Sequence, residues 1–495
     1  MPKILSFIKT YYIVILLLLA GLFLRTYQAQ ELFLYNHDND LAGWFVRDVV
    51  EIKHLRLIGQ ETSTKGIFIG PLFYYLLIPF YLLLKMDPVG GVFLVSLIGL
   101  FTMWSFYYVF NNLFNQKTGV VALLIYAFSF FGIMNDRWVV PTMPVVLWTL
   151  WFFYTLSLLM KGKQKLAYLL VGMLFALIWH LNISLALLAP LVLLAQYLSG
   201  RSPDYRKVIN GFVVFMVFSI PLILFEVRHR FQQVSAFTGA LSSVQGDIYE
   251  GVDKIERVFY LFSKNFTNLL WGSEERLSYQ IVFILGLVLF AFLIYKKIIT
   301  RKYGILLSAW FLIYFVFFAL YSKIVSEYYL DGVMIIWFTF FTLFITFLLS
   351  NSKLKILGMG FLLLYVFINV NRFFSIEINR SGYLERKAII SEIKKDVYKN
   401  NYQCIAISYI TDPGYDLGYR YFIYLDNLNL NHISDDIPIY TIVFPLGKDG
   451  VESDKTFGAL GLIYPDYKRY SEETVKSNCQ KENTNLTDSM FGFTN

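Results

Sequence analysis

Residues 279–295, YQIVFILGLVLFAFLIY, contain no charged residue and no proline. A bilayer core needs about 20 mainly apolar residues per helix, so this stretch predicts a membrane-spanning helix. Similar stretches recur near residues 10–26, 68–84, 89–110, 118–134, 138–160, 166–180, 183–199, 208–225, 303–320, 329–349 and 353–371. Together they predict a mostly α fold, a polytopic membrane bundle of about 11–12 transmembrane or re-entrant helices.

The composition of the whole chain supports this class of protein. Apolar residues make up 57% of the 495 residues and charged residues 16%, against about 45–50% and 25% in soluble domains. The net charge is +8. These values exclude an ordinary soluble protein and a disordered one.

The charged residues are concentrated in the last quarter of the chain. Residues 373–495 contain 30 charged residues in 123, whereas residues 1–372 contain 48 in 372. The sequence therefore predicts a membrane domain over 1–372 and a C-terminal soluble domain over 373–495. The helical pattern of 384–399 and the strand-like runs CIAISYI and IYTIVFP predict a small α/β domain there. The only two cysteines, Cys404 and Cys479, either form a disulfide or remain separate.

The positions of Lys and Arg predict the orientation in the membrane, because these residues favour cytoplasmic loops. Lys3, Lys9, the KGKQK run at 161–165 and the cluster at 296–302 place the N-terminus inside. The same path places a first loop at 27–67, a loop at 226–278 and the C-terminal domain outside the plasma membrane. This arrangement requires an odd number of crossings, so we expect 68–84, which is short and contains two prolines, to be re-entrant or tilted.

The first outer loop carries the most informative polar residues. Asn36 or Asp38 can cap a helix, and from Asp40 onward the pattern is helical. An apolar stripe predicts a helix lying at the membrane interface; it comprises Leu41, Phe45, Val49 and Ile52, opposite Asp40, Arg47, Glu51 and His54.

Asp38 and Asp40 allow two interpretations. Acidic residues favour helix N-termini, so the pair could serve only to cap the helix and to be solvated. Alternatively, one carboxylate acts as a general base toward an acceptor hydroxyl, while the other holds the acceptor or a divalent metal. Spacing alone leaves both open.

Three stretches together resemble a known family. They are HDND with LIGQETSTKGIFIGPLFYYLLIPF (residues 37–40 and 57–80), DRWVVPTMPVVLWTL (136–150) and ALIWHLNISLALLAPLVLL (176–194). In this order they resemble a bacterial branch of the GT-C membrane glycosyltransferases, of the family 39, protein-mannosyltransferase-like type. The resemblance implies an enzyme that transfers a sugar from a polyprenyl-phosphate carrier to a lipid, glycan or protein acceptor on the outer face, with inversion. It implies Asp38 as the catalytic base and Asp40 as the second candidate. It implies no required cofactor and leaves a divalent metal at Asp38 and Asp40 as an open alternative.

Further candidates could bind the carrier phosphate or the sugar, since a phosphate leaving group needs cations or N–H donors. Each also has a structural interpretation as an interfacial anchor, an aromatic belt residue or a hydrogen-bonded buried group. These candidate substrate-binding residues are Lys65, Tyr74, Arg137, His180, Asn182 and Arg228.

Other functions compete with this one. A transporter or flippase of lipid-linked sugars would place charges within mid-membrane helices, and a polymerase or ligase of cell-surface glycans could use the basic residues of the 226–278 loop. The sequence contains no nucleotide-binding motif and predicts no nucleic-acid partner. The expected partners are membrane lipids and the lipid-linked donor, and the oligomeric state is left open.

Overall fold

The computed structural model describes residues 2–62, 64–242, 252–272, 277–321, 325, 327–434, 436–470, 472–479 and 483–487. The chain divides into two compact units. The helical unit comprises residues 1–27, 95–137 and 141–376, and the mixed unit comprises 28–94, 138–140 and 377–495. The boundary at 376/377 lies near the predicted one at 372/373, but residues 28–94 belong with the C-terminal residues rather than with the membrane helices.

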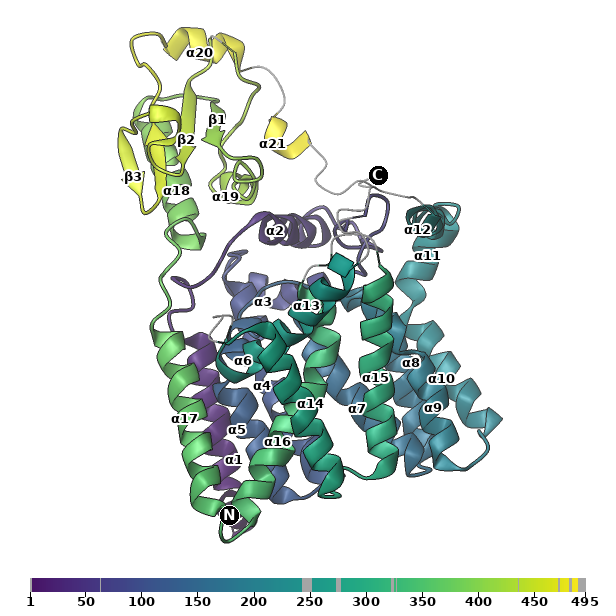
Figure 1. The fold of residues 1–495 in the computed structure, drawn as a ribbon. Coiled ribbons are helices and arrows are strands. Elements are labelled where there is room, and N and C mark those ends of the chain that lie inside the picture. Colours follow the sequence, from purple (N-terminus) through teal and green to yellow (C-terminus); the bar gives the residue numbers. More distant parts are fainter. Residues whose placement is uncertain are drawn as a thin grey trace. The chain divides into compact units, whose positions relative to one another are not determined.

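The helical unit is a bundle of long apolar helices (Figure 1). Its elements are α1 (Pro2–Thr26), α5 (Gln116–Phe128), α6 (Phe130–Asn135), α7 (Val145–Met160), α8 (Gln164–Leu181), η1 (Ile183–Leu188), α9 (Pro190–Ser199), α10 (Tyr205–Phe218), α11 (Ile220–Arg228), α12 (Gln232–Ser242), α13 (Val252–Trp271), α14 (Tyr279–Tyr295), α15 (Arg301–Leu320), η2 (Glu327–Val333), α16 (Met334–Ser350) and α17 (Lys355–Phe374). The boundary between the units falls within α4 (Gly90–Leu113).

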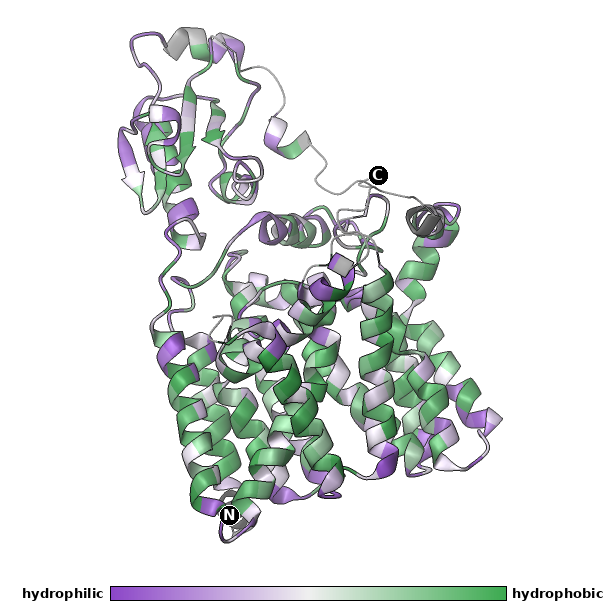
Figure 2. Cartoon of the chain, viewed as in Figure 1, coloured by the Kyte–Doolittle hydropathy of each residue, from purple (hydrophilic) through white to green (hydrophobic). Residues whose placement is uncertain are grey.

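The helices of this unit are hydrophobic along most of their length and carry hydrophilic residues near their ends (Figure 2). Among the described residues, five helices are long and apolar enough to cross a membrane, or six if the bent pair of α10 and α11 is one span. Six shorter apolar helices accompany them. The chain is therefore a multi-pass membrane protein, and the predicted helical bundle is confirmed.

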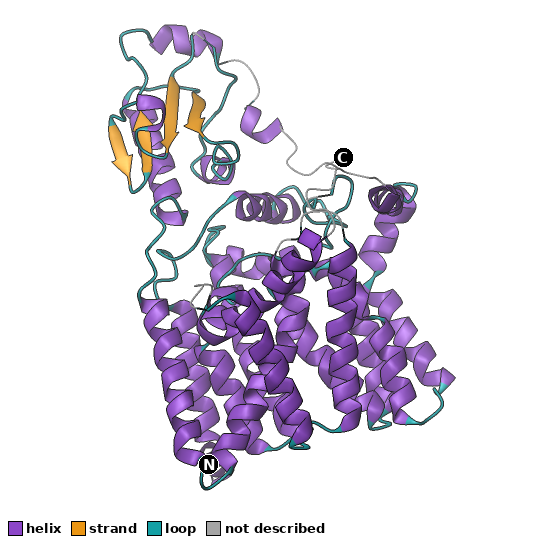
Figure 3. Cartoon of the chain, viewed as in Figure 1, coloured by secondary structure: helices purple, strands orange, loops and turns teal. Residues whose placement is uncertain are grey.

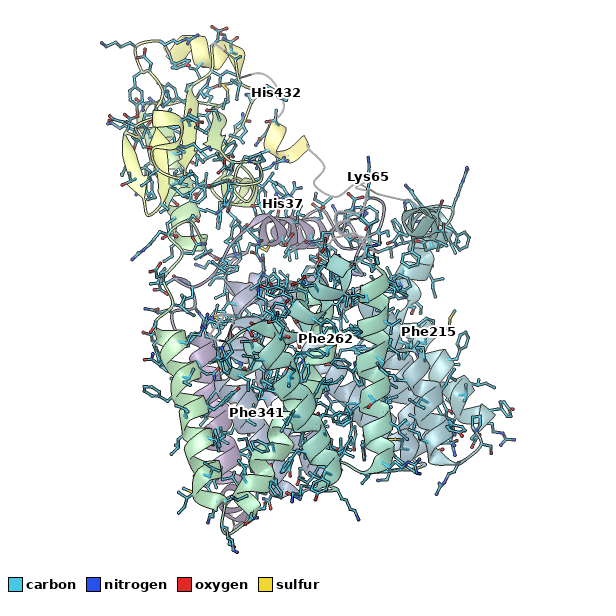
Figure 4. The ribbon with its side chains drawn as sticks, in the orientation of Figure 1. His37, Lys65, Phe215, Phe262, Phe341 and His432 are labelled. Atoms are coloured by element: carbon cyan, nitrogen blue, oxygen red, sulfur yellow. A yellow bond between two sulfur atoms is a disulfide. The ribbon has the colours of Figure 1, made fainter. Side chains whose placement is uncertain are left out.

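The predicted outer loop at 226–278 is largely helical in its described part. It contains α12 and the 20-residue α13. Val258 and Phe262 of α13 are fully buried in the core of the helical unit, and Phe266 is nearly so. Figure 4 labels Phe262. The predicted loop therefore contains a helix with a buried apolar face, which the charged residues at the start of α13 did not indicate.

The mixed unit combines short helices with a four-stranded sheet (Figure 3). Its helices are α2 (His37–Val50), α3 (Leu72–Leu83), α18 (Tyr383–Lys399), α19 (Arg420–Leu425), η3 (Lys448–Gly450), α20 (Glu472–Asn478) and α21 (Thr484–Thr487). Its strands are β1 (Ala406–Thr411), β2 (Ile439–Phe444), β3 (Lys455–Phe457) and β4 (Leu460–Ile463).

The sheet has the order β1-β2-β4-β3. Strands β1 and β2 are parallel, with Ala406 opposite Ile439, and the other two pairings are antiparallel. The predicted helix at 384–399 and both predicted strands are confirmed by α18, β1 and β2. Cys404 and Cys479 form a disulfide, which decides between the two alternatives left by the sequence.

The helix α3 corresponds to the predicted stretch 68–84. Its 12 residues span about 18 Å at 1.5 Å per residue, well short of a hydrocarbon core of about 30 Å. The helix is therefore too short to cross a membrane by itself, and a re-entrant or tilted placement stays a prediction.

Candidate active site

The helix α2 begins at a well-defined cap. The Asn36 side chain accepts hydrogen bonds from the backbone N–H of Asp38 (3.0 Å) and of Asn39 (3.4 Å), and the Asn36 N–H donates to the Asn39 side chain (3.0 Å). Of the two predicted caps, Asn36 is therefore the one used. Asp38 and Asp40 both lie in the first turn of α2.

Asn39 fixes this end of the helix to a distant segment. Its amide donates to the carbonyl of Val139 at 2.8 Å, and its side chain is almost completely buried. Because the amide is satisfied on both sides, it can hold the first turn of α2 in one orientation.

Asp38 is half-buried, and its Oδ1 accepts a hydrogen bond from the side-chain amide of Gln60 at 3.0 Å. Gln60 is itself held by backbone pairing, since the Ile69 N–H donates to the Gln60 carbonyl at 3.0 Å and the Gly59 N–H donates to the Ile69 carbonyl at 2.7 Å. Asp38 is therefore oriented by the segment that follows α2 and still reaches solvent.

Asp40 differs completely in its surroundings. It is fully buried, and its Oδ1 accepts from the Tyr35 hydroxyl (3.1 Å) and from the backbone N–H of Tyr421 in α19 (3.0 Å). Burial raises the pKa of Asp40 to about 6, and these hydrogen bonds and the positive charges of Arg386 and Arg420 only partly oppose that rise. Asp40 is thus placed to join α2 to α19 rather than to meet a substrate.

Aromatic and charged side chains extend the contact between α2 and α19. The Arg47 guanidinium lies over the rings of Trp44 (5.3 Å) and Tyr424 (5.2 Å), and the Tyr424 hydroxyl donates to Glu51. A Cβ at Gly43 would lie 2.6 Å from the Tyr421 ring, so only glycine fits there. The C-terminal residues therefore form part of the support for α2.

The predicted helix extends too far. It ends at Val50, with Glu51 as its cap, so Ile52 and His54 lie beyond it. The following segment is tied back by Arg56, which is buried and forms an ion pair with Asp48. The predicted polar face is also partly wrong, because Asp40 is buried while Ile52 is 53% exposed.

His37 is a neighbour of Asp38 that the sequence analysis did not select. Burial lowers the pKa of His37, although the charges of Asp38 and Asp416 act in the opposite direction. The surroundings of His37 therefore favour its neutral imidazole. Figure 4 labels His37 at the start of α2 and Lys65 in the segment that follows this helix.

The two other candidates of the mixed unit lie in different environments. Tyr74 is buried, and its ring stacks on Phe45 with 4.9 Å between centroids. A Cβ at Gly59 would lie 2.2 Å from that ring. Lys65 is exposed and precedes Gly66, whose φ of +80° makes a turn that favours glycine. Tyr74 thus packs in the interior, whereas Lys65 is accessible.

Arg137, in the helical unit, is buried. Its guanidinium donates to the carbonyls of Leu24 (3.0 Å) and Arg25 (2.9 Å) at the end of α1. The adjacent Asp136 forms a buried ion pair with Arg25 at 2.7 Å and accepts from the Tyr126 hydroxyl at 2.6 Å. This cluster connects the ends of α1, α5 and α6. The sequence analysis did not select Arg25, because a single Arg at the end of an apolar stretch gives no sign of a buried partner.

The remaining candidates also lie in the helical unit. His180 is buried in the last turn of α8. Asn182 caps η1 by accepting from the Ser184 N–H at 2.9 Å, and its amide donates to the Tyr328 carbonyl at 3.5 Å. Arg228 is exposed at the end of α11. The eight predicted residues therefore divide equally between the two units.

The structure also bears on which groups could hold a metal. Among the described residues, no group of three or more His, Cys, Asp or Glu side chains is placed to hold one. Asp38 and Asp40 supply two carboxylates, but Oδ1 of Asp40 already accepts two hydrogen bonds. A divalent metal at this pair stays a prediction.

Two neighbours of Asp38 that the sequence analysis did not select could have been found from the sequence. Gln60 lies in the same stretch as the acidic motif, and an amide that follows a predicted helix can return to its first turn. His37 directly precedes Asp38. Tyr35 and Tyr421 offered no comparable signal, since Tyr421 lies 381 residues from Asp40.

No protein-family model and no curated protein matches this sequence. Solved structures do match. ArnT from Cupriavidus metallidurans bound to undecaprenyl phosphate has a TM-score of 0.60 and 10% identity, over 93% of this chain and 99% of that chain. The apo state of ArnT gives a TM-score of 0.59 and 10% identity, over 92% and 98%.

A further match is the Archaeoglobus fulgidus oligosaccharyltransferase in complex with Zn and sulfate. Its TM-score is 0.48 at 11% identity, over 87% of this chain and 67% of that chain. The ArnT match covers nearly the full length of both chains. The chain therefore shares the fold of ArnT, and the predicted fold class, a membrane helical bundle with a small C-terminal α/β region, is confirmed.

Proposed function

We propose that this protein is an integral-membrane glycosyltransferase that takes its sugar from a polyprenyl-phosphate carrier. The proposal is supported by the fold shared with ArnT, whose structure was determined with undecaprenyl phosphate bound. The family 39 resemblance of the acidic motif and its two companion stretches points to the same chemistry.

The observation that carries the proposal is the difference between Asp38 and Asp40. Asp38 is half-buried and oriented by Gln60, whereas Asp40 is fully buried and holds α2 to α19. A general base must reach the proton that it removes. Asp38 is therefore the proposed base, and Asp40 the proposed positioning residue that assists it.

In the proposed reaction, Asp38 accepts the proton of the acceptor hydroxyl. The acceptor oxygen forms a bond to the anomeric carbon while the bond from that carbon to the phosphate oxygen breaks. The electron pair leaves with the polyprenyl phosphate, and attack from the opposite face inverts the anomeric centre.

The leaving phosphate requires cationic or N–H donors. Lys65 and Arg228 are exposed cations. These two side chains are the proposed cationic donors, and His180 and Asn182 are the proposed polar donors. Arg137 already donates to the backbone of α1, so its proposed role is to shape the site. Tyr74 would act in the same way, through its packing against Phe45.

The proposed orientation places α2 and the C-terminal unit outside the plasma membrane and the N-terminus in the cytosol, as the distribution of Lys and Arg predicts. The disulfide of Cys404 and Cys479 is compatible with that oxidising side.

The test is sugar transfer by the purified full-length protein in liposomes. Radiolabelled polyprenyl-phosphate sugars are compared with the corresponding nucleotide sugars, and Asp38→Asn serves as the inactive control. We expect label to be released from the carrier only by the wild-type protein. Equal use of nucleotide sugars, or full activity of Asp38→Asn, would contradict the proposal. An assay with a chelator decides whether a divalent metal takes part.

A further inference from the structure

An open cavity of about 390 Å³ lies at one end of the α8–α10 pair in the helical unit. Its lining combines lysines with apolar side chains and comprises Gly162, Lys163, Gln164, Lys165, Leu166, Leu169 and Lys207. None of these residues belongs to the candidate active site. The cavity therefore needs its own explanation.

The two loops that border the cavity are strongly basic. Residues 161–165 and 199–207 contain six Lys and Arg residues and a single acid, Asp204. Asp204 pairs with Lys207 at 2.9 Å, so a large positive excess remains. Partial burial and the neighbouring charge of Lys163 lower the pKa of Lys161. A bound anion would relieve this repulsion.

The cavity is held in shape by its own residues. The buried Gln164 donates to the Ser202 carbonyl (2.8 Å) and accepts from the Asp204 N–H (2.9 Å). Arg201 donates to the Gly162 carbonyl at 3.4 Å. These bonds connect the start of α8 to the loop before α10, so both basic loops are fixed beside one another.

The two helices are also in close contact. A Cβ at Gly172 would lie 1.9 Å from the Gly211 carbonyl oxygen, so the backbones of α8 and α10 pack directly on each other. Both helices begin beside the cavity, at Gln164 and Tyr205. Their N-terminal N–H groups add partial positive charge to that of the lysines.

The outer surface of this helix pair is suited to lipid. On α10, Ile209, Phe212 and Val213 are each more than half exposed, and Leu166 at the cavity is 48% exposed. A water-soluble anion would gain nothing from this apolar surface. A phospholipid would gain from both parts, because its phosphate and its acyl chains need different environments.

We propose that this cavity binds the headgroup of an anionic phospholipid. The phosphate would lie among Lys163, Lys165 and Lys207, and the acyl chains would follow Leu166, Leu169 and the exposed apolar residues of α10. Basic pockets between membrane helices are recurrent sites for such headgroups. The predicted cytoplasmic position of residues 161–165 agrees with this assignment.

The test is native mass spectrometry of the full-length protein in neutral detergent, titrated with phosphatidylglycerol or with phosphatidylcholine. The cavity variant combines Lys163→Ala, Lys165→Ala and Lys207→Ala. The control combines Lys296→Ala, Lys297→Ala and Lys302→Ala, which removes the same charge on the same predicted side but away from the cavity. Unfolding midpoints of both variants verify that they fold.

We expect phosphatidylglycerol to bind at least tenfold more tightly than phosphatidylcholine. Each lysine near a lipid surface contributes a factor of about five, so the cavity variant should bind about 100-fold more weakly and the control less than about threefold. If the triple variant does not fold, Lys165→Gln alone should weaken binding about fivefold.

Three results would overturn the proposal. Equal losses in the cavity and control variants would mean that binding depends only on net charge. Equal binding of the two lipids would remove the phosphate–lysine interaction as its cause. Full competition by millimolar inorganic phosphate would assign the cavity to a free anion instead of a lipid.

Discussion

Aspartates have different surroundings in the α2 helix of the mixed unit and in the ionic cluster of the helical unit. In the helical unit, Arg25 and Asp136 are fully buried and bound to each other, and Tyr126 completes the cluster. In the mixed unit, Asp40 is buried in a comparable way, but Asp38 two residues earlier is half-exposed. Complete burial with fixed partners therefore marks a carboxylate that braces the fold, whereas partial exposure leaves a carboxylate available for chemistry.

Neutralising each α2 carboxylate in turn tests whether Asp38 and Asp40 have different roles. Asp38→Asn should lower sugar transfer by about 10²–10⁴-fold, the usual contribution of a general base, without changing the unfolding midpoint. Asp40→Asn keeps an acceptor oxygen for Tyr35 and Tyr421 and should retain most of the activity. Transfer rates and melting curves of both variants decide the matter. If Asp40→Asn loses as much activity as Asp38→Asn, the division of roles is wrong.

Substitutions in the ionic cluster of the helical unit should lower the stability of the protein instead of acting directly on the sugar-transfer step. Asp136→Ala leaves the Arg25 guanidinium buried without its carboxylate, which typically costs about 3–5 kcal/mol. The double variant Arg25→Met with Asp136→Leu removes both charges and should be much closer to the wild type. Unfolding of the purified protein in detergent measures both. An Asp136→Ala protein as stable as the wild type would mean that the pair is not the brace described here.

Stability should also depend on pH through Asp40. Its pKa is raised from 3.8 to about 6 in the folded protein, so between these values the unfolded state releases a proton that the folded state keeps. The contribution of Asp40 to stability is therefore largest below about pH 4 and is lost as the pH rises to about 6, by up to about 3 kcal/mol. Asp40→Asn should remove this part of the pH dependence.

Tyr35→Phe provides a second test of the pH-dependent contribution of Asp40. The Tyr35 hydroxyl donates to Asp40, which favours the charged form, so its loss should move the pH-dependent range upward. Melting curves from pH 4.5 to 8 for the wild type and both variants provide the measurement. Identical curves for wild type and Asp40→Asn would show that Asp40 does not titrate in this range.

Much of the helical unit was predictable, because membrane helices are defined by composition over one continuous stretch. The run at 279–295 coincides with α14, and 303–320 lies within α15. The helix α13 was missed because Asp253, Lys254, Glu256 and Arg257 make its first turns look like a charged loop. Its burial depends on neighbouring helices that hydropathy alone does not reveal.

The candidate site was only partly predictable, for the same reason. A helix start with a cap at Asn36 or Asp38 follows from local sequence, and the structure selects Asn36. The roles of Asp40, Tyr74 and Arg137 follow from partners far along the chain, such as Tyr421 and the end of α1. Local spacing treats Asp38 and Asp40 as equals, and only tertiary contacts separate a buried anchor from an accessible base.

The smallest expected effect concerns the cap that places both carboxylates. Asn36→Ala removes the acceptor for the N–H groups of Asp38 and Asn39 and should cost about 1 kcal/mol, whereas Asn36→Asp should be nearly neutral. Because Asp38 lies within the frayed turn and Asp40 is held by α19, fraying should disturb the base more than the anchor. Sugar transfer by Asn36→Ala should therefore fall by more than its small loss of stability implies, and Asn36→Asp should restore it. Equal activity of the two variants would mean that Gln60 alone is sufficient to orient Asp38.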